Sequence, residues 1–319
     1  MVRRITGKVA RLVVVLFLVT FGTFMLVRLL PGDPVEKMIP FGSDLEAQRA
    51  QLRAEIGLDE PAVQQYGSWV AGLVTGDLGT VYPSRTPVWE VLSSAAPVTL
   101  LLILYAQVLA LLVAIPLGVL TAYRAGTWLD KSASVSAFGL LSIPSFVLGL
   151  YLAYFVGAKL QWLPAGQYVR FGTDPVEYFR SMALPTISLA AGQVALYMRL
   201  LRSDMIATLQ ESFVKTARSK GLTTRRVLWR HALRPSSLTL LTFAGLNIGT
   251  LVGSAVVVET VFSLPGLGTE IYKAIIGQQY VALQTYVALI GVGYVLINFS
   301  VDFLYTVLDP RIRHERASS

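Results

Sequence analysis

Long apolar blocks separated by polar segments make up most of this chain. The first block runs from Leu12 to Leu30, and five more occupy 98–123, 132–158, 182–198, 236–258 and 284–308. A transmembrane α-helix needs about 20 predominantly apolar residues to cross the hydrocarbon core of a bilayer. Each block is close to that length. The pattern predicts an all-α polytopic membrane protein with six transmembrane helices.

A small helical segment outside the membrane is predicted between the first two blocks. Ser43-Asp44-Leu45-Glu46 has the spacing of a capping box, and Gly57 is a typical helix stop. A second helix is expected to begin near Pro61. The predicted organisation is therefore an N-terminus with the first span at 1–30, an external helical segment at 31–96, a five-helix membrane core at 97–308 and a tail at 309–319.

Four amides interrupt the apolar blocks: Gln107, Gln193, Asn247 and Asn298. Polar groups inside a membrane are costly, so they usually face a cavity or a neighbouring helix. The four are candidates for lining a translocation pathway. The alternative is hydrogen bonding between helices, which contributes roughly 0.6 kcal/mol per bond.

Three glycines, Gly245, Gly249 and Gly253, are spaced four residues apart in the fifth block. Such spacing creates a smooth face on which another helix backbone can approach closely. We expect this face to pack against a helix of the same chain, with a partner chain as the alternative.

Composition supports a membrane protein and excludes several kinds of chemistry. Hydrophobic residues make up 54% of the 319 residues and charged residues only 14%, against about 25% charged in a soluble domain. The chain has no Cys and only two His, which excludes disulfides and thiolate metal sites. It also lacks the G-x-x-x-x-G-K-[ST] loop that cradles ATP phosphates. We therefore expect no metal, no cofactor and no enzyme activity in this chain.

The positive charge is unevenly distributed. Of the 27 Lys and Arg residues, 18 fall on one side of the predicted membrane and 8 on the other. Cytoplasmic loops are enriched in Lys and Arg, so both termini and the loop at 199–235 are predicted to be cytoplasmic. The net charge of +8 then requires no nucleic-acid partner.

The loop at 199–235 has a pattern of two short helices joined by a turn at Gly221-Leu222, with Thr223 or Thr224 as N-cap of the second helix. It could be a topology signal or a docking element for another protein. Nucleic-acid binding is less favoured, because the loop lies between spans and is not expected to present interleaved aromatic residues. Its nine cations are Arg199, Arg202, Lys215, Arg218, Lys220, Arg225, Arg226, Arg230 and Arg234.

This loop resembles the coupling loop of permease subunits of ATP-binding-cassette importers, whose general pattern is E-A-A-x3-G-x9-I-x-L-P. The first Glu and Ala, the Ile and the Pro of that pattern are absent here, and Pro235 comes one residue late. At these positions the loop resembles the sequence pattern of the dipeptide, oligopeptide and nickel permeases, which is K-T-A-R-x-K-G-L followed by H-x-L-R. The residues that carry the resemblance, and to which it assigns ATPase coupling, are Lys215, Thr216, Ala217, Arg218, Lys220, Gly221, Leu222, His231, Leu233 and Arg234.

The resemblance extends over nearly the whole chain. Four further stretches fit the same branch: L-P-G-D-P at 30–34, G-L-D-E-P at 57–61, G-D-L-G at 76–79 and E-T-V-F-S-L-P-G-L-G at 259–268, and L-D-P-R at 308–311 begins the tail. The long segment after the first span is similar to that of the B-type permease of such pairs.

The resemblance implies the fold, the function and the partners. The fold would be a type I importer permease in a prokaryotic plasma (inner) membrane, in contact with lipid. The chain would form half of a peptide pathway with a second, C-type permease. Two ABC ATPase subunits would bind ATP and Mg, and an extracytoplasmic binding protein would deliver the substrate. Relatives also handle nickel, glutathione or haem, so these cargoes stay open. A self-sufficient secondary carrier and a membrane anchor are the remaining alternatives.

Overall fold

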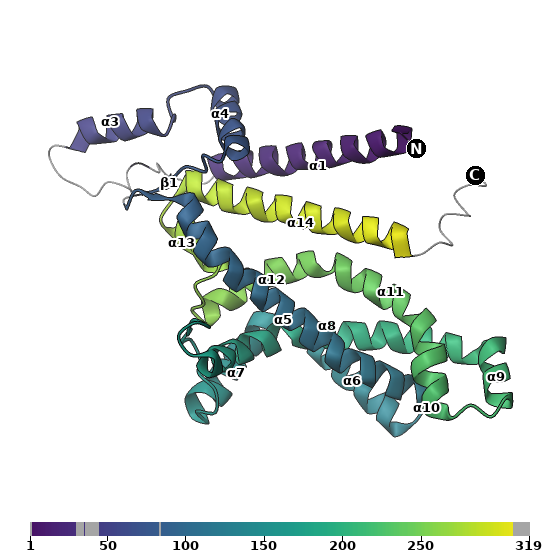
Figure 1. Cartoon of the computed structure of the whole chain (residues 1–319). Helices are drawn as coiled ribbons and strands as arrows, with labels where there is room; N and C mark the ends of the chain where they lie inside the picture. Colours follow the sequence, from purple (N-terminus) through teal and green to yellow (C-terminus); the bar gives the residue numbers. More distant parts are fainter. Residues whose placement is uncertain (1, 30–34, 36–44, 83, 309–319) are drawn as a thin grey trace. The chain divides into compact units, whose positions relative to one another are not determined.

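The computed structural model describes residues 2–29, 35, 45–82 and 84–308, with side chains described at 10–29, 35, 46–82 and 84–299. In these residues the secondary structure is helical apart from one two-stranded hairpin (Figure 1). The chain divides into two compact units. Unit 1 comprises Met1–Val98 and Pro265–Phe299, and unit 2 comprises Thr99–Leu264 and Ser300–Ser319.

In unit 1, helix α1 (Val2–Arg28) packs on helix α4 (Ala62–Thr75) through an aromatic cluster. The ring of Tyr66 lies 5.5 Å from that of Phe21 and 5.4 Å from that of Phe24. The Tyr66 hydroxyl is hydrogen-bonded to that of Thr20 at 2.9 Å. Aromatic pairs in edge-on geometry add stability beyond their buried area, so this cluster attaches α4 to the first span.

The hairpin of unit 1 joins strands β1 (Thr80–Val81) and β2 (Thr86–Pro87), with Thr80 opposite Pro87. Gly79 precedes it with φ +82°, and a Cβ there would lie 2.6 Å from Cγ1 of Val281. Only glycine fits both the left-handed backbone and this close approach. The remaining helices of the unit are α3 (Leu45–Glu55), α13 (Leu267–Ile276) and α14 (Tyr280–Leu308), and α5 (Val88–Tyr123) begins in it.

The side-chain amide of Gln279 makes two hydrogen bonds to the backbone of the hairpin, as a neighbouring strand does. Its amide nitrogen donates to the carbonyl oxygen of Tyr82 at 2.6 Å, and its oxygen accepts from the Tyr82 backbone N–H at 3.0 Å. Gln279 is 9% exposed. One buried side-chain amide therefore pairs with both the N–H and the carbonyl of Tyr82 in this short hairpin.

Unit 2 is built around helix α8 (Pro175–Gln210), which contacts α6 (Trp128–Ser142), α7 (Ser145–Leu152), α11 (Leu233–Leu246) and α12 (Ile248–Val261). Asp174 caps α8, because its side chain accepts from the backbone N–H groups of Val176 and Glu177. Pro175 suits the first helical position, which needs no N–H. The other helical segments of this unit are η1 (Ala153–Lys159), α9 (Ser212–Ser219), α10 (Thr224–Arg226) and η2 (Val227–Ala232).

Two of the predicted spans are bent. The pair Trp128–Ser142 and Ser145–Lys159 bends by 97°, and the pair Thr224–Leu246 and Ile248–Val261 bends by 47°. Pro144 stands at the first break, where its missing N–H removes the bond to the carbonyl of Leu140. Asn247 stands at the second. With each pair taken as one span, the described residues contain six candidate spans, as the hydrophobic pattern predicts.

Several boundaries differ from the sequence-based expectation. Helix α8 runs from 175 to 210 rather than 182 to 198, and at 1.5 Å per residue its 36 residues extend about 54 Å, beyond a hydrocarbon core of about 30 Å. Hydropathy detects only the membrane part of such a helix. Helix α5 begins at Val88, inside the predicted external segment, while the hairpin and α13 were not predicted. Ser43-Asp44 of the capping box and the tail at 309–319 lie outside the described residues.

The clamp on the hairpin gives a first prediction. Gln279→Leu removes two hydrogen bonds, each contributing roughly 1 kcal/mol, from the backbone of Tyr82. We expect amide exchange across the hairpin at 79–88 to become at least tenfold faster, measured by hydrogen–deuterium exchange with mass spectrometry. Gln64→Leu, a change at an exposed glutamine of α4, should leave exchange at the hairpin unchanged. Equal exchange in both variants would show that Gln279 does not hold the hairpin.

Candidate functional site

The polar loop at 199–235, between the fourth and fifth apolar blocks, is folded. Helix α8 continues to Gln210, and α9 then begins at Ser212 after Glu211 leaves the helical backbone at ψ 150°. A turn leads to α10 and η2, which continue into α11. The segment predicted as a loop from residue 199 thus begins as a continuation of α8, so Arg199 and Arg202 belong to that helix.

A small apolar cluster holds the short helices of this loop together. Val214, Ala217 and Val227 are 0%, 7% and 1% exposed, and Leu209 and Leu222 pack against them. The cluster joins the end of α8 to α9 and η2. Ala217 and Leu222, two of the residues assigned to coupling, therefore face inward and shape the loop.

Gly221 closes α9 in a left-handed conformation, with φ +76°. Its backbone N–H donates to the carbonyl of Arg218 at 2.9 Å, and the next N–H, of Leu222, donates to that of Ala217 at 3.3 Å. This places Gly221 in the turn that the sequence pattern predicts. Thr223 occupies the N-cap position of α10 but makes no side-chain capping bond, so the expected hydroxyl cap is wrong for Thr223. Thr224 lies inside the helix.

The outward face of the loop is basic and carries two exposed aromatic rings. Phe213 is 47% exposed and Trp229 is 46% exposed. These rings correct the expectation that the loop presents no interleaved aromatic residues, and both are visible in the sequence. His231 and Leu233 are half-buried. The exposed residues assigned to coupling are Lys215, Thr216, Arg218, Lys220, Gly221 and Arg234.

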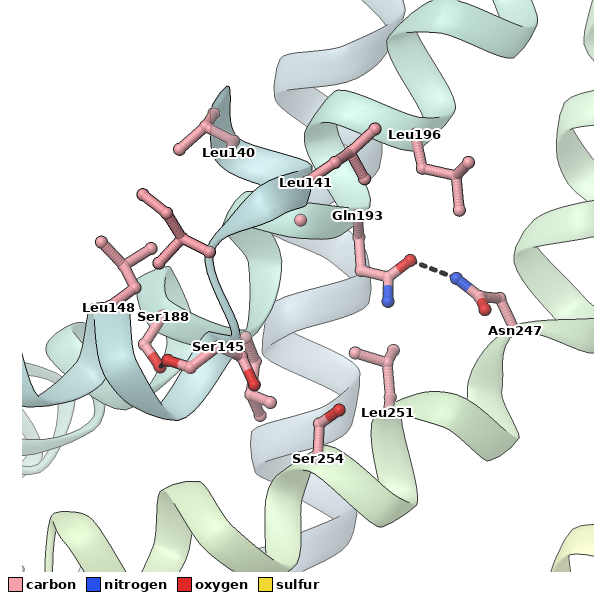
Figure 2. Close-up of a pocket in the computed structure, with 13 residues that line it drawn as sticks. Leu140, Leu141, Ser145, Leu148, Ser188, Gln193, Leu196, Asn247, Leu251 and Ser254 are labelled. Atoms are coloured by element: carbon pink, nitrogen blue, oxygen red, sulfur yellow. Dashed lines mark hydrogen bonds between the residues drawn. The ribbon is translucent and has the colours of Figure 1, made fainter. Parts of the chain in front are cut away.

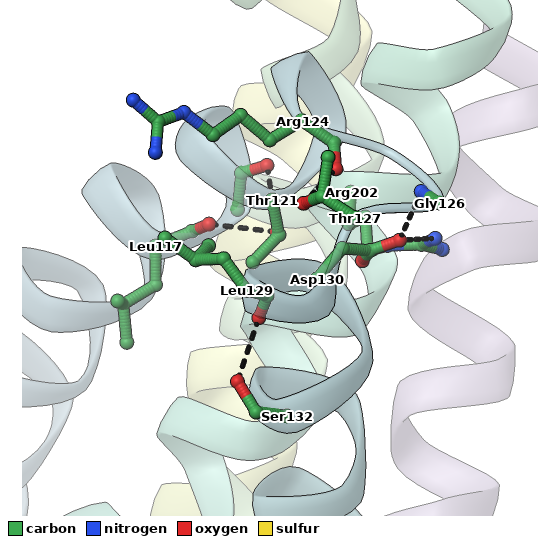
Figure 3. A network of polar contacts seen from close by, with 10 residues as sticks. Leu117, Thr121, Arg124, Gly126, Thr127, Leu129, Asp130, Ser132 and Arg202 are labelled. Atoms are coloured by element: carbon green, nitrogen blue, oxygen red, sulfur yellow. Dashed lines mark hydrogen bonds and ion pairs between the residues drawn. The ribbon is translucent and has the colours of Figure 1, made fainter.

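Two of the cations counted with the loop are engaged by helix α6 instead. Arg202 binds Asp130 in a two-point ion pair, Nε to Oδ1 at 2.5 Å and Nη2 to Oδ2 at 2.8 Å (Figure 3). The guanidinium of Arg199 lies 4.2 Å from the ring centroid of Phe138. These contacts join α8 to α6 beside the turn that connects α5 and α6.

Asp130 is almost completely enclosed, at 3% exposure. Its Oδ2 also accepts from the backbone N–H of Gly126 at 2.8 Å, so the carboxylate receives three hydrogen bonds. A buried charge is tolerated when it is paired and fully hydrogen-bonded. Sequence reasoning missed this ion pair, although Asp130 is the only acid in the short turn predicted at 124–131.

Three of the four amides predicted to line a pathway meet in unit 2. The Gln107 amide nitrogen donates to the carbonyl of Ala244 at 3.3 Å, and its oxygen accepts from the Tyr197 hydroxyl at 3.1 Å. The Asn247 amide nitrogen donates to the Gln193 side-chain oxygen. Asn298 lies in unit 1, where it bonds to the carbonyl of Tyr294 in its own helix.

A cavity of about 200 Å³ lies beside two of these amides (Figure 2). Gln193 and Asn247 line it, whereas Gln107 does not. Its walls come from α8 and from the two bent helix pairs. The assignment of all four amides to a pathway stays a prediction.

The three spaced glycines do not form one continuous face, because the bend at Asn247 separates Gly245 from Gly249 and Gly253. A Cβ added to the exposed Gly253 would meet no atom within 4 Å. Gly253 is therefore not a point of close packing within the described residues. Packing of this face against a partner chain stays a prediction.

Six candidate spans with a folded basic loop between two of them define a polytopic helical membrane protein. Residues 114–314 match the family described as binding-protein-dependent transport system inner membrane component, and residues 1–103 match the N-terminal region described for the same kind of membrane component. The chain belongs to this family of permeases. It is thus a transport component of the inner membrane, in a system that works with a binding protein and an ATPase.

Two relatives show how far the similarity extends. The chain is 36% identical over 321 residues to the dipeptide transport system permease protein DppB of Escherichia coli K12, covering 93% of this chain and 95% of the relative. It is 35% identical over 313 residues to a protein of Sinorhizobium fredii named "Probable peptide ABC transporter permease protein", covering 98% of both. The family resemblance drawn from separate motifs is confirmed.

The ion pair of Asp130 and Arg202 gives a prediction for stability. Asp130→Asn leaves the Arg202 guanidinium without its counter-charge, and we expect a loss of roughly 1.5–3 kcal/mol, the range for hydrogen bonds to charged groups. The loss should appear as a lower thermal midpoint by circular dichroism in detergent. Arg202→Lys keeps the charge but cannot bond at two points, so its thermal midpoint should fall by less than that of Asp130→Asn.

A matched control is available on the same helix α8. Glu177 pairs with Arg180, and their side chains are 40% and 45% exposed. Exposed pairs contribute about 0–1 kcal/mol, so Glu177→Gln should change the midpoint little. If Asp130→Asn and Glu177→Gln lowered the thermal midpoint equally, the ion pair at Asp130 would contribute no more to stability than an exposed pair.

Proposed function

We propose that this chain is one of two permeases of an importer that carries di- and oligopeptides across the membrane, driven by ATP hydrolysis in partner subunits. The observation that supports the cargo is the near full-length similarity to permeases named for peptide and dipeptide transport. The second permease is of the C type, and an extracytoplasmic binding protein delivers the peptide. ATP and Mg are bound by the two ATPases.

The loop from α9 to η2 is the site where one ATPase docks. Its inner face is fixed by the apolar cluster of Val214, Ala217 and Val227, so the outer face is presented as a rigid surface. That face combines cations with the rings of Phe213 and Trp229. Aromatic residues commonly anchor protein interfaces, and charges at the rim mainly guide association. The expected partner surface has a cleft for the rings and acidic groups around it.

The orientation in the membrane is part of the same proposal. The basic loop, the short turn at 124–127 and both termini face the cytoplasm, consistent with the excess of Lys and Arg on that side. Helices α3, α4 and α13 and the hairpin of unit 1 then face outward, towards the binding protein. Lipid surrounds the apolar outer faces of the spans.

Reconstitution tests the proposal as a whole. The purified chain should hydrolyse no ATP, and it should co-purify with its ATPases and second permease when they are expressed together. The complete complex in liposomes should accumulate a labelled tripeptide of alanine only when ATP and the binding protein are both supplied. Uptake by the lone chain under an ion gradient would instead identify a secondary carrier.

Gly221→Val tests the docking loop. Valine is strongly disfavoured at φ +76°, whereas asparagine tolerates the left-handed region. A Cβ at this position meets no atom within 4 Å, so only the backbone conformation is tested. We expect Gly221→Val to lower ATP-driven peptide uptake at least tenfold and Gly221→Asn to retain most of it. Wild-type uptake by Gly221→Val would show that the turn is not needed for coupling.

A further inference from the structure

The cavity in unit 2 lies where two interrupted helices meet α8. One wall is the break between α6 and α7 at Ile143, and another is the bend at Asn247 (Figure 2). Non-helical backbone at membrane depth is tolerated where it is buried in protein or lines a cavity. Both breaks of unit 2 therefore open onto the same space of about 200 Å³.

The polar groups of the cavity are neutral, and several have hydrogen-bonding capacity to spare. Gln193 uses its side-chain oxygen for Asn247, and its amide nitrogen makes no hydrogen bond within the described part of the chain. The Ser188 hydroxyl donates to the backbone carbonyl of Ser145. The hydroxyls of Ser145 and Ser254, which also line the cavity, have no partner among the described residues.

The rest of the lining is apolar, with Leu140, Leu148 and Leu251 among its side chains. No Asp, Glu, Lys, Arg or His of the described residues belongs to it. A cavity of this composition offers no counter-charge to a charged group, and it has none of the imidazole or thiolate side chains that transition metals favour. It suits a neutral group that both donates and accepts hydrogen bonds and carries an apolar portion.

We propose that this cavity binds one neutral peptide unit of the cargo, together with its side chain, during passage through the membrane. The inference rests on the proposed peptide transport. The amide nitrogen of Gln193 would donate to the carbonyl of the peptide unit. The hydroxyls of Ser145 and Ser254 would pair with its N–H. The leucines would contact the side chain.

The volume fits part of a peptide rather than a whole one. This cavity measures about 200 Å³. Pockets for complete drug-sized ligands begin at about 300 Å³. A site that binds one repeating unit through neutral hydrogen bonds holds its ligand briefly, which passage through a pathway requires.

Cysteine labelling tests the site directly, because the chain has no cysteine of its own. Ser254→Cys is close in size to the original residue. In the complete complex, with partner subunits free of reactive cysteine, a small water-soluble methanethiosulfonate reagent should modify it. During transport of the alanine tripeptide, the modification rate should fall at least threefold. Ser93→Cys, at an exposed position of α5, should react at the same rate with and without peptide.

Two results of this labelling would overturn the proposal. One is a thiol in the Ser254→Cys variant that reacts at the same rate during transport as in the absence of peptide. The other is a thiol in that variant that does not react at all in a complex that transports, because water would then not reach the cavity.

A second variant fills the space. Ser254→Leu places an apolar side chain in the cavity, and we expect peptide uptake to fall at least tenfold while the variant still co-purifies with its ATPases. Val257→Leu adds bulk at an exposed position of the same helix α12 that does not line the cavity, and should keep uptake.

The two proposals fail in different ways. A wild-type complex that takes up no tripeptide would overturn the proposed transport function itself. Wild-type uptake that persists in Ser254→Leu would leave the function intact and overturn the cavity as a peptide site.

Discussion

The hydrocarbon core of a membrane has no water to pair with polar groups, so backbone groups at that depth are paired within the protein or line a cavity. In unit 2 helix α8 supplies these partners. The Ser188 hydroxyl donates to the carbonyl of Ser145 beside the first helix break, and Gln193 accepts from Asn247 at the second. Further along, the Tyr197 hydroxyl bonds to Gln107 of α5. The interrupted spans keep their bent shape because one continuous helix provides these bonds.

The same helix connects the cavity to the loop proposed for docking. Gln193 lines the cavity and Gln210 ends the helix, and the roughly 17 residues between them correspond to about 25 Å of helix. Arg202 lies between these points and is bound at two points to Asp130 of α6. A displacement at α9 would therefore move α8 and α6 together. Under the proposed function, this is a direct mechanical path from the ATPase to the space where the peptide passes.

The sequence predicted those features that depend on local pattern. Span positions follow from runs of apolar residues, and the turn at Gly221 follows from a glycine between two short amphipathic segments. Features that depend on distant partners were not predictable in this way. Nothing local to Asp130 specifies Arg202, 72 residues away, and nothing local to Gln279 specifies the backbone of Tyr82. Pro144 was identified within a span, but the 97° bend there depends on packing against α8.

The extent of α8 also could not be obtained from hydropathy. Its ends are polar, and its start is fixed by the side chain of Asp174 rather than by apolar residues. For the candidate site, the amides at Gln193 and Asn247 were visible in the sequence as polar residues within spans. That they bond to one another and line one cavity, while Gln107 bonds to Ala244 and Tyr197, follows only from their places in the fold.

The neutral lining has a consequence for selectivity. A cavity without ionisable residues can pair with a peptide backbone, which is common to every peptide, but it gains little from the charge of a particular side chain. Discrimination is a difference between affinities, so a site that binds the shared part of all substrates contributes little to it. If this cavity is the binding site for the peptide within the membrane, selection among peptides takes place earlier, at the external binding protein. The permease then needs only to release each peptide unit readily, and a small neutral cavity meets that requirement.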